Sequence, residues 1–410
     1  MRTKFVIEFA AIAGFFWIFT IIDPFYLWNS FENVLKLFFG SLVILATVLL
    51  NTKGKLIITK KGLRLAAVIM LYFIYLSWRL DANVLSVIVR FFVFFPFVLL
   101  AFWQNEILYS LFLFFRRIIV FFSIGSIIIS ICSVAGLVQY IPHYYLEARS
   151  SVHEMQNLSY CVYGCIVTLH GYYASFIPRA CGPLQEPGHF AVILGFVFLI
   201  DRFMRRKVNI WIVICGVLTF SMNFFILAVF GEIYDMFVNK VGVRKLKIYI
   251  SILIMGIFVF FLLSENLQKQ FLFLFYERNL EQVVDSYMST NSLSGALDER
   301  INQTGAFYYE QFTHSSKIMY GIGILDKEIV LSDYRGLILR VGYVGFWISL
   351  LLGFFSLLRA HVKQRIFLIG ALFLVYIHRA WMMQQPYIYF FVFLSCCMYN
   401  YCAWRELKAH

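Results

Sequence analysis

One short run of the sequence combines an arginine, a glutamate and a histidine with a constrained backbone. Residues 179–189 read Arg-Ala-Cys-Gly-Pro-Leu-Gln-Glu-Pro-Gly-His, and an almost wholly apolar segment, residues 190–200, follows directly. The guanidinium of Arg179 suits bidentate contact with a phosphate or a carboxylate. Glu186 and His189 are residue types that act as general bases toward a hydroxyl group. The run therefore predicts a site that binds an anion and removes a proton.

The composition predicts a protein that crosses a membrane many times. Of the 410 residues, 61% are hydrophobic and only 14% are charged, whereas about 25% of the residues of a soluble domain are charged. Too little polar surface remains to cover one water-soluble core. The net charge of +13 is explained by basic loops on the cytoplasmic side of a bilayer. We therefore expect the lipid bilayer as a partner and no nucleic acid.

The apolar runs indicate an all-α polytopic membrane protein with about twelve transmembrane helices. Two of the expected helices are short, lie between residues 208 and 238, and break near residues 221–223. The other expected helices cover about residues 5–22, 34–50, 63–79, 84–103, 117–138, 188–202, 247–263, 336–358, 366–380 and 387–403. The short basic loops then fall on one side, which the positive-inside rule makes cytoplasmic, together with both termini.

This topology places two large loops outside the cytoplasm and divides the chain into five regions. They are an N-terminal five-helix membrane region (1–138), a first external loop with the Arg179–Glu186 motif (139–187), central membrane helices (188–263), a second large external loop (264–335) and C-terminal membrane helices (336–410). Within the first loop, the tyrosine-rich residues 158–177 predict a re-entrant or interfacial element, because tyrosine favours the membrane–water boundary.

Four further arginines are candidates for substrate binding. Arg300 and Arg335 belong to the second external loop, while Arg90 and Arg340 fall inside expected helices. A charge within a span costs at least about 2.5 kcal/mol, so we expect Arg90 and Arg340 to face a polar cavity. The alternative is that both side chains extend to the outer interface.

Simpler interpretations remain open for the other candidates. Arg179 would then bind lipid headgroups, Glu186 would only pair with Arg179, and His189 would cap a helix. Arg300 would pair with the acidic residues just before it.

No motif for a nucleotide or a metal ion accompanies these residues. The sequence contains no phosphate-binding P-loop, His-Glu-x-x-His or EF-hand pattern, and its cysteines follow no strong metal spacing. We therefore expect no cofactor and no metal. An enzyme that works outside the cytoplasm without ATP needs a preactivated donor, and a lipid-linked pyrophosphate sugar is such a donor.

Several motifs follow residues 179–189 in a fixed order. They are Leu218-Thr219-Phe220-Ser221, Arg300, Gly321-Ile322-Gly323 and Gly342-Tyr343-Val344-Gly345. Their order resembles the Wzy-type O-antigen and capsule repeat-unit polymerases, which are grouped with the O-antigen ligases. The resemblance covers roughly residues 170–360.

The resemblance implies a membrane glycosyltransferase that polymerises polyprenyl-pyrophosphate-linked oligosaccharides on the outer face of the bacterial cytoplasmic membrane. The product would be O-antigen, capsule or exopolysaccharide, and a chain-length regulator protein would be a candidate partner. Arg179, Arg300 and Arg335 or Arg340 would hold the pyrophosphates, with Glu186 or His189 as the base. The reaction would invert the anomeric carbon and need no metal.

Two other functions remain as alternatives. Ligases of the group usually carry a His-Asn pair ahead of the late helix, where this chain has Ser332-Asp333-Tyr334-Arg335. That departure favours a polymerase over a ligase-type transferase. A lipid-linked oligosaccharide flippase also uses about twelve helices, but we would expect it to lack two large polar external loops.

Overall fold

The computed structural model describes most of the chain and divides it into two compact units. The described residues are 3–25, 31–80, 83–146, 159–170, 178–205, 207–238, 260–262, 264–272, 303–323, 334–358, 362–379 and 386–409. Unit 1 comprises Met1–Phe121, Ile200–Arg206 and Phe307–His410, and unit 2 comprises Phe122–Leu199 and Lys207–Ala306.

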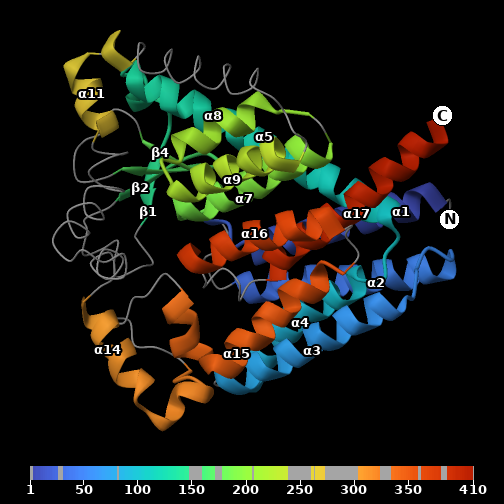
Figure 1. Ribbon diagram of the computed structural model, residues 1–410. Coiled ribbons are helices and arrows are strands. Elements are labelled where there is room, and N and C mark those ends of the chain that lie inside the picture. Colours follow the sequence, from blue (N-terminus) through green and yellow to red (C-terminus); the bar gives the residue numbers. More distant parts are fainter. Residues whose placement is uncertain are drawn as a thin grey trace. The chain divides into compact units, whose positions relative to one another are not determined.

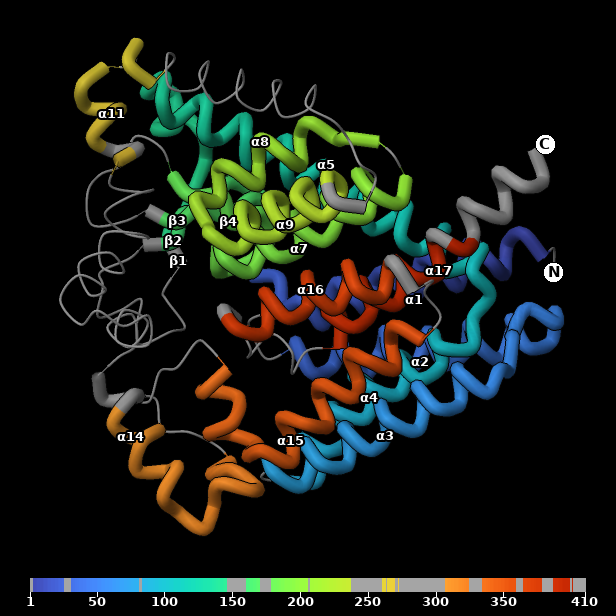
Figure 2. Tube along the Cα trace, viewed as in Figure 1, coloured from blue at the N-terminus to red at the C-terminus, as the bar shows by residue number. Residues whose placement is uncertain are grey.

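Unit 1 is helical in its described part. Its elements are α1 (Thr3–Ile21), α2 (Glu32–Thr52), α3 (Lys60–Leu80), α4 (Val84–Leu100), the first part of α5 (Asn105–Val134), the π-helix η3 (Ile200–Met204), most of α14 (Gln303–Thr313), η5 (Ser316–Met319), α15 (Tyr334–Ser356), α16 (Val362–Arg379) and α17 (Pro386–Ala409). Helix α2 packs against α1 and α4, and α3 runs alongside α4 and α15 (Figures 1 and 2).

Within unit 1, a side chain from another helix replaces the hydrogen bond that a proline removes from α4. Pro96 lacks an N–H group, so the carbonyl of Phe92, four residues earlier, loses its helical partner. The indole Nε1 of Trp17 in α1 donates to this oxygen at 3.1 Å. Trp17 is fully buried, so the bond replaces the lost one where water cannot.

A buried carboxylate binds two arginines at η3. The Asp201 carboxylate accepts from Arg116 Nε and from Arg205 Nη1, each at 2.5 Å. Asp201 is 1% exposed, and both arginine side chains are largely buried. The carboxylate therefore offsets two positive charges that would otherwise be isolated in apolar surroundings.

Unit 2 contains a small antiparallel sheet beside its helices. The strands β1 (Tyr144–Leu146), β2 (Ser159–Tyr163), β3 (Ile166–His170) and β4 (Arg179–Gly182) follow the order β1-β2-β3-β4. Its helices include the second part of α5, α7 (Pro187–Leu199), α8 (Ile210–Leu218), α9 (Met222–Val238) and α11 (Glu265–Leu272), with the 3₁₀-helix η2 (Val138–Tyr140). Helix α7 packs against α8, α9 and β4 (Figure 1).

This sheet adds strands to a chain predicted as all-α. Residues 159–170, within the segment predicted to be a re-entrant or interfacial element, form a β-hairpin. Gly164, at φ +62°, begins the two-residue turn between Tyr163 and Ile166. A left-handed glycine matches the twist of paired strands, which favours a tight hairpin.

The residue ranges of the other described helices nearly match the apolar runs of the sequence. In the described part, six helices are long and apolar enough to cross a membrane: Thr3–Ile21, Glu32–Thr52, Lys60–Leu80, Asn105–Val134, Pro187–Met204 and Tyr334–Ser356. Shorter apolar helices cover Val84–Leu100, Gln364–Ile377 and Pro386–Met398. The chain is thus a predominantly helical membrane protein, and the count of twelve stays a prediction because most of the helix expected at 247–263 lies outside the described residues.

One helix boundary differs clearly from the expectation. Helix α5 begins at Asn105, whereas the sequence predicts a helix only from about residue 117. Ile107, Leu108 and Leu111 are fully buried, and their helical spacing places them on one face. Packing of this apolar face stabilises the helical conformation of the short segment that was expected to be a loop.

The buried charge cluster at η3 predicts a large effect of removing its acid. Asp201→Asn should lower the free energy of unfolding by about 3–5 kcal/mol, because two buried guanidinium groups lose their counter-charge. Thermal unfolding of the purified protein in detergent measures the change. The exposed pair of Lys4 and Glu8 supplies the control, since Glu8→Gln should cost at most about 1 kcal/mol. Equal effects of the two substitutions would contradict this account of Asp201.

Candidate functional site

The run at residues 179–189 forms the junction between β4 and α7. Strand β4 ends at Gly182, and the Leu184 N–H donates to the Cys181 carbonyl at 3.0 Å to close a turn. The Glu186 carbonyl accepts the N–H groups of His189 at 3.1 Å and Phe190 at 3.2 Å. Pro187 occupies the first position of the helix, where its missing N–H costs nothing. Glu186 and His189 therefore lie at the N-terminus of α7.

Gly182 is required by both conformation and space. Its φ is +60°, and a Cβ placed there would lie 2.6 Å from the Phe190 ring. The ring from the first turn of α7 thus packs directly on the backbone of the turn. This contact fixes the start of α7 relative to β4.

Arg179 is buried and bonded to the end of α8. Its Nε donates to the Thr219 carbonyl at 3.1 Å and its Nη2 to the Phe220 carbonyl at 3.3 Å. These oxygens lie at the break between α8 and α9, where Phe220 has a φ of +45°, and helix ends leave such carbonyls unpaired. Arg179 is therefore held in one orientation rather than bound loosely at a lipid surface.

A second bond ties the same break to the start of α7. The buried Asn223 amide, in the first turn of α9, donates to the Gly188 carbonyl at 3.3 Å. The predicted break at residues 221–223 is confirmed, since α8 ends at Leu218 and α9 begins at Met222. The Leu218–Ser221 motif and residues 179–189 thus meet in one place.

The electrostatics of the junction place Glu186 and Arg179 close to the same buried groups. Burial raises the pKa of the Tyr160 phenol in β2, the charges of Cys181 and Glu186 raise it further, and Arg179 opposes them. Burial likewise raises the pKa of the Cys181 thiol, where Arg179 and Glu186 act in opposite directions. Glu186 and His189 are half-buried. The junction therefore carries an acid, an imidazole and a fixed cation close to the buried side chains of Tyr160 and Cys181.

Unit 1 contains a second irregular site, at a break inside α15. Gly342 has the non-helical angles φ 64° and ψ −179°. The N–H groups of Ile322 and Gly323 donate to the carbonyls of Leu339 at 2.8 Å and Arg340 at 2.9 Å. The predicted Gly-x-Gly motif is therefore bonded to the turn of α15 that directly precedes the Gly-x-x-Gly motif.

Two side chains of α3 donate further hydrogen bonds at this break. Tyr75 OH donates to the Val341 carbonyl at 2.6 Å, and Arg79 Nη2 donates to the Gly321 carbonyl at 2.6 Å. The guanidinium of Arg79 also lies 4.9 Å from the Trp78 ring centre. The sequence did not identify either residue as part of a site, although their spacing of four places them on one helix face.

The motif glycines at this break have no room for a side chain. A Cβ on Gly321 would lie 2.4 Å from the Arg340 carbonyl oxygen, and one on Gly342 would lie 2.3 Å from that of Met319. One on Gly345 would lie 2.6 Å from the Tyr75 ring. At Gly321 and Gly342 the facing backbones therefore approach too closely for any residue but glycine, whereas at Gly345 neighbouring side chains fill the space.

The other arginines that were predicted to bind substrate lie in several different places in the chain. Arg340 is half-buried two residues before the break, and among the residues that the structure describes it has no ion pair. Arg335 lies in the first turn of α15 beside the Tyr334 ring, and Arg90 in α4 lies within electrostatic range of the Tyr72 hydroxyl. Arg300 lies outside the described residues. Unit 1 therefore holds three of the predicted arginines, and unit 2 holds Arg179 with Glu186 and His189.

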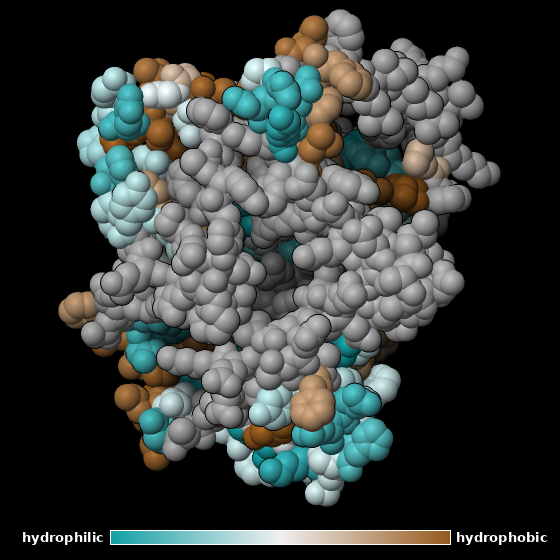
Figure 3. All heavy atoms as spheres, turned by 90° about the vertical axis from the view of Figure 1, so that its left-hand side faces the viewer, coloured by the Kyte–Doolittle hydropathy of each residue, from teal (hydrophilic) through white to brown (hydrophobic). Residues whose placement is uncertain are grey.

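Helix α14 adjoins the break in α15. Burial raises the pKa of the Tyr309 phenol, the Tyr343 hydroxyl raises it further, and Arg335 opposes them. Figure 3 looks onto the side of unit 1 that carries α14, where hydrophilic side chains gather at the lower edge. No group of three or more potential metal ligands occurs among the described residues.

The α15 break predicts that Gly342 tolerates no substitution. Gly342→Ala should cost about 1–3 kcal/mol for backbone angles that are essentially restricted to glycine and about 1–3 kcal/mol more for the contact with Met319. Gly136→Ala is the matched control, because Gly136 has a φ of +69° but open space around it. Thermal unfolding in detergent compares the two, and equal shifts would contradict the close approach.

The junction predicts that Cys181 resists alkylation in the folded protein. Its thiol is fully buried and its pKa is raised, and the thiolate is the reactive form. Cys165, partly exposed in the β2–β3 turn, should react first with N-ethylmaleimide near pH 8. Peptide mass spectrometry before and after denaturation measures both sites. Fast labelling of Cys181 in the native state would contradict the buried strand.

Comparisons with protein-family models, curated proteins and solved structures each found no match for this chain. The function is therefore proposed from the sequence pattern and the geometry of the two sites.

Proposed function

We propose that the chain is a membrane glycosyltransferase that polymerises polyprenyl-pyrophosphate-linked oligosaccharide repeat units on the outer face of the bacterial cytoplasmic membrane. The observation that supports the proposal is that Arg179 begins β4 while Glu186 and His189 lie at the start of α7, with the charges of Arg179 and Glu186 both acting on the Tyr160 phenol. A fixed arginine suits a pyrophosphate, and a carboxylate or an imidazole suits a sugar hydroxyl that must lose a proton.

The reaction moves a glycan from its lipid pyrophosphate to a hydroxyl group of the acceptor sugar. The hydroxyl oxygen attacks the anomeric carbon of the donor while the bond from that carbon to the pyrophosphate oxygen breaks. Glu186 or His189 accepts the hydroxyl proton, and the pyrophosphate leaves on its lipid. Attack opposite the leaving group inverts the anomeric carbon. Arginine charge stabilises the negative charge that develops on the leaving group.

Donor and acceptor each carry a pyrophosphate, so the proposed reaction needs two cationic positions. Arg179 supports one of them, because its two bonds to backbone carbonyls fix its orientation. The resemblance implies Arg300 and Arg335 or Arg340 as the other pyrophosphate-binding candidates, with Arg90 as a further candidate for substrate binding. Arg340 is half-buried and forms no ion pair within the described part of the chain, which favours an anionic ligand.

The proposed base predicts a loss of polymer when its carboxylate is removed. Glu186→Gln keeps the shape of the side chain and the backbone bonds that begin α7, but it cannot accept the proton. If Glu186 is the base, the rate should fall by about 10²–10⁴-fold. The measurement is polymer length and amount in a strain that lacks the native protein. His189→Gln tests the other candidate in the same assay.

A matched control uses another glutamate at a helix start. Glu106, in the first turn of α5, is exposed, so Glu106→Gln should leave polymer formation unchanged. Normal polymer from both Glu186→Gln and His189→Gln would exclude these residues as the base. Normal polymer from Arg179→Ala and Arg300→Ala as well would contradict the proposed function.

A further inference from the structure

Arg79, in the last turn of α3, lies beside the α15 break. Its Nη2 donates to the Gly321 carbonyl at 2.6 Å, and its guanidinium lies 4.9 Å from the centre of the Trp78 ring. Its Nε is buried and has no hydrogen-bond partner within the described part of the chain. The bond to Gly321 is the one hydrogen bond that this side chain makes there, although a guanidinium has five N–H donors. The protein therefore fixes Arg79 in place and leaves most of its donors for a ligand.

The Gly321-Ile322-Gly323 segment brings Arg79 and Arg340 together. The Gly323 N–H donates to the Arg340 carbonyl at 2.9 Å. A Cβ on Gly323 would lie 2.8 Å from the Arg79 carbonyl oxygen and 3.9 Å from Arg79 Nη2, and one on Gly321 would lie 2.4 Å from the Arg340 carbonyl oxygen. Both arginines thus lie against the same three residues, and their long side chains can reach the same ligand.

Neither arginine has a counter-charge among the residues that the structure describes. Both are half-buried, and neither forms an ion pair there. The Arg340 side chain also makes no hydrogen bond within the described ranges. A charge in apolar surroundings is costly unless it is paired. The two cations therefore favour a negatively charged ligand at the break.

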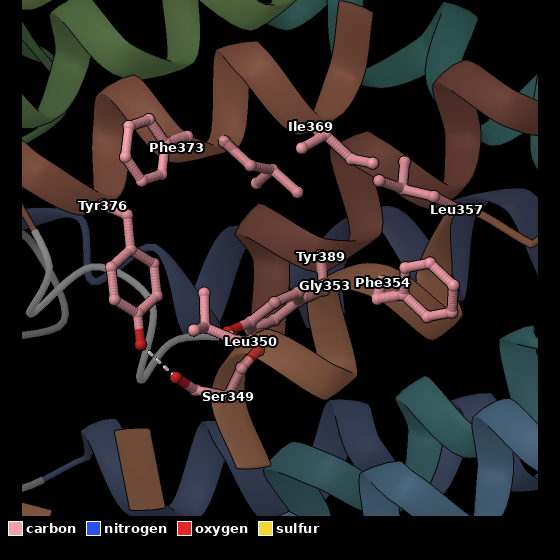
Figure 4. A pocket seen from close by; sticks show the side chains of 10 residues that line it. Ser349, Leu350, Gly353, Phe354, Leu357, Ile369, Phe373, Tyr376 and Tyr389 are labelled. Atoms are coloured by element: carbon pink, nitrogen blue, oxygen red, sulfur yellow. Dashed lines mark hydrogen bonds between the residues drawn. The ribbon is translucent and has the colours of Figure 1, made fainter. Parts of the chain in front are cut away.

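Two other polar clusters of unit 1 are paired within the protein itself. The two arginines at η3 share one buried carboxylate. Farther along α15, the Ser349 and Tyr376 hydroxyls form a hydrogen bond, drawn in Figure 4, and Tyr389 OH donates to the Ser349 carbonyl at 3.1 Å. The break at Gly342 thus differs from both clusters, because its cations have no acid in the described part of the chain.

The aromatic side chains beside Arg79 indicate the depth of the site in a membrane. The Trp78 and Tyr320 rings are 61% and 50% exposed, and their centres lie 5.7 Å apart. Trp and Tyr are enriched at the membrane–water interface, at the level of the lipid headgroups. The other end of α3 begins with two lysines, which the positive-inside rule makes cytoplasmic. We therefore expect the break at the outer interface, at the depth of lipid phosphates.

We propose that Arg79 and Arg340 together bind the diphosphate of a lipid-linked substrate at the α15 break. The inference rests on the proposed function and adds Arg79 to the residues that hold the pyrophosphate. The diphosphate of a lipid-linked sugar carries two charged phosphate groups, so each guanidinium can bind one of them. The phosphodiester of a phospholipid carries only one, so a pair of cations favours the diphosphate.

Photolabelling of the purified full-length protein in detergent tests this site. The probe is polyprenyl pyrophosphate with a diazirine beside the diphosphate, and mass spectrometry locates the label. We expect label on peptides that contain residues 72–80, 317–323 or 334–345. Unlabelled polyprenyl pyrophosphate should compete about tenfold better than polyprenyl monophosphate or phosphatidylglycerol, because the second phosphate adds charged hydrogen bonds.

Substitution of either arginine should remove both the label and the preference for the diphosphate. Arg79→Gln and Arg340→Gln keep a side-chain N–H donor but lose the charge, so each should reduce labelling about tenfold or more. Arg79→Lys keeps the charge and a donor for the Gly321 carbonyl but lacks the planar fork of a guanidinium. It should therefore lose the preference for the diphosphate, which tests the site if Arg79→Gln fails to fold.

Arg365 in α16 supplies the matched control. Its Nη2 donates to the Leu358 carbonyl at 3.0 Å, so Arg365→Gln removes the same kind of bond away from the break and should leave labelling unchanged. A structural role of Arg79 alone would lower the thermal stability of its variants without changing which lipid competes. That result, full labelling of the folded Arg79 and Arg340 variants, or equal competition by phosphatidylglycerol would overturn the proposal.

Labelling requires no transfer reaction, so the two proposals fail separately. A protein that is labelled at the break but never extends a glycan would contradict the proposed function and leave the diphosphate site. A protein that polymerises without label at the break would contradict the site alone.

Discussion

A carbonyl or N–H group freed by a break in an apolar helix has no water to bond, so another part of the chain must supply its partner. Trp17 does this for the carbonyl exposed by Pro96 in α4. Arg179 does it at the α8–α9 break, and the Gly-x-Gly segment with Tyr75 does it at Gly342. Each repair joins segments that are distant in the sequence.

The same requirement positions the candidate functional residues. The bonds from Arg179 to the end of α8 and from Asn223 to Gly188 fix the junction at which Glu186 and His189 begin α7. At the other break, the bond from Gly323 holds the Arg340 backbone. Polar side chains in apolar surroundings are thus held in one orientation by their hydrogen bonds to backbone groups. A binding or catalytic site requires side chains that are held in this way.

The sequence predicted local features well and long-range contacts poorly. Apolar runs located α1 to α4, and the residues at 218–223 located the α8–α9 break, because both depend on neighbouring residues. Tyr75 bonds to a carbonyl 266 residues away, and no local pattern encodes such a partner. The β2–β3 hairpin was missed because its tyrosines and valines fit a membrane interface as well as a buried sheet.

The most direct test of the central claim is a reaction with purified protein in liposomes that contain polyprenyl-pyrophosphate-linked repeat units. The account predicts lipid-linked products that grow by whole repeat units, without added nucleotide, as resolved by mass spectrometry. Transfer of finished glycan only to a different acceptor, or movement of the lipid-linked substrate across the bilayer without any new glycosidic bond, would contradict it.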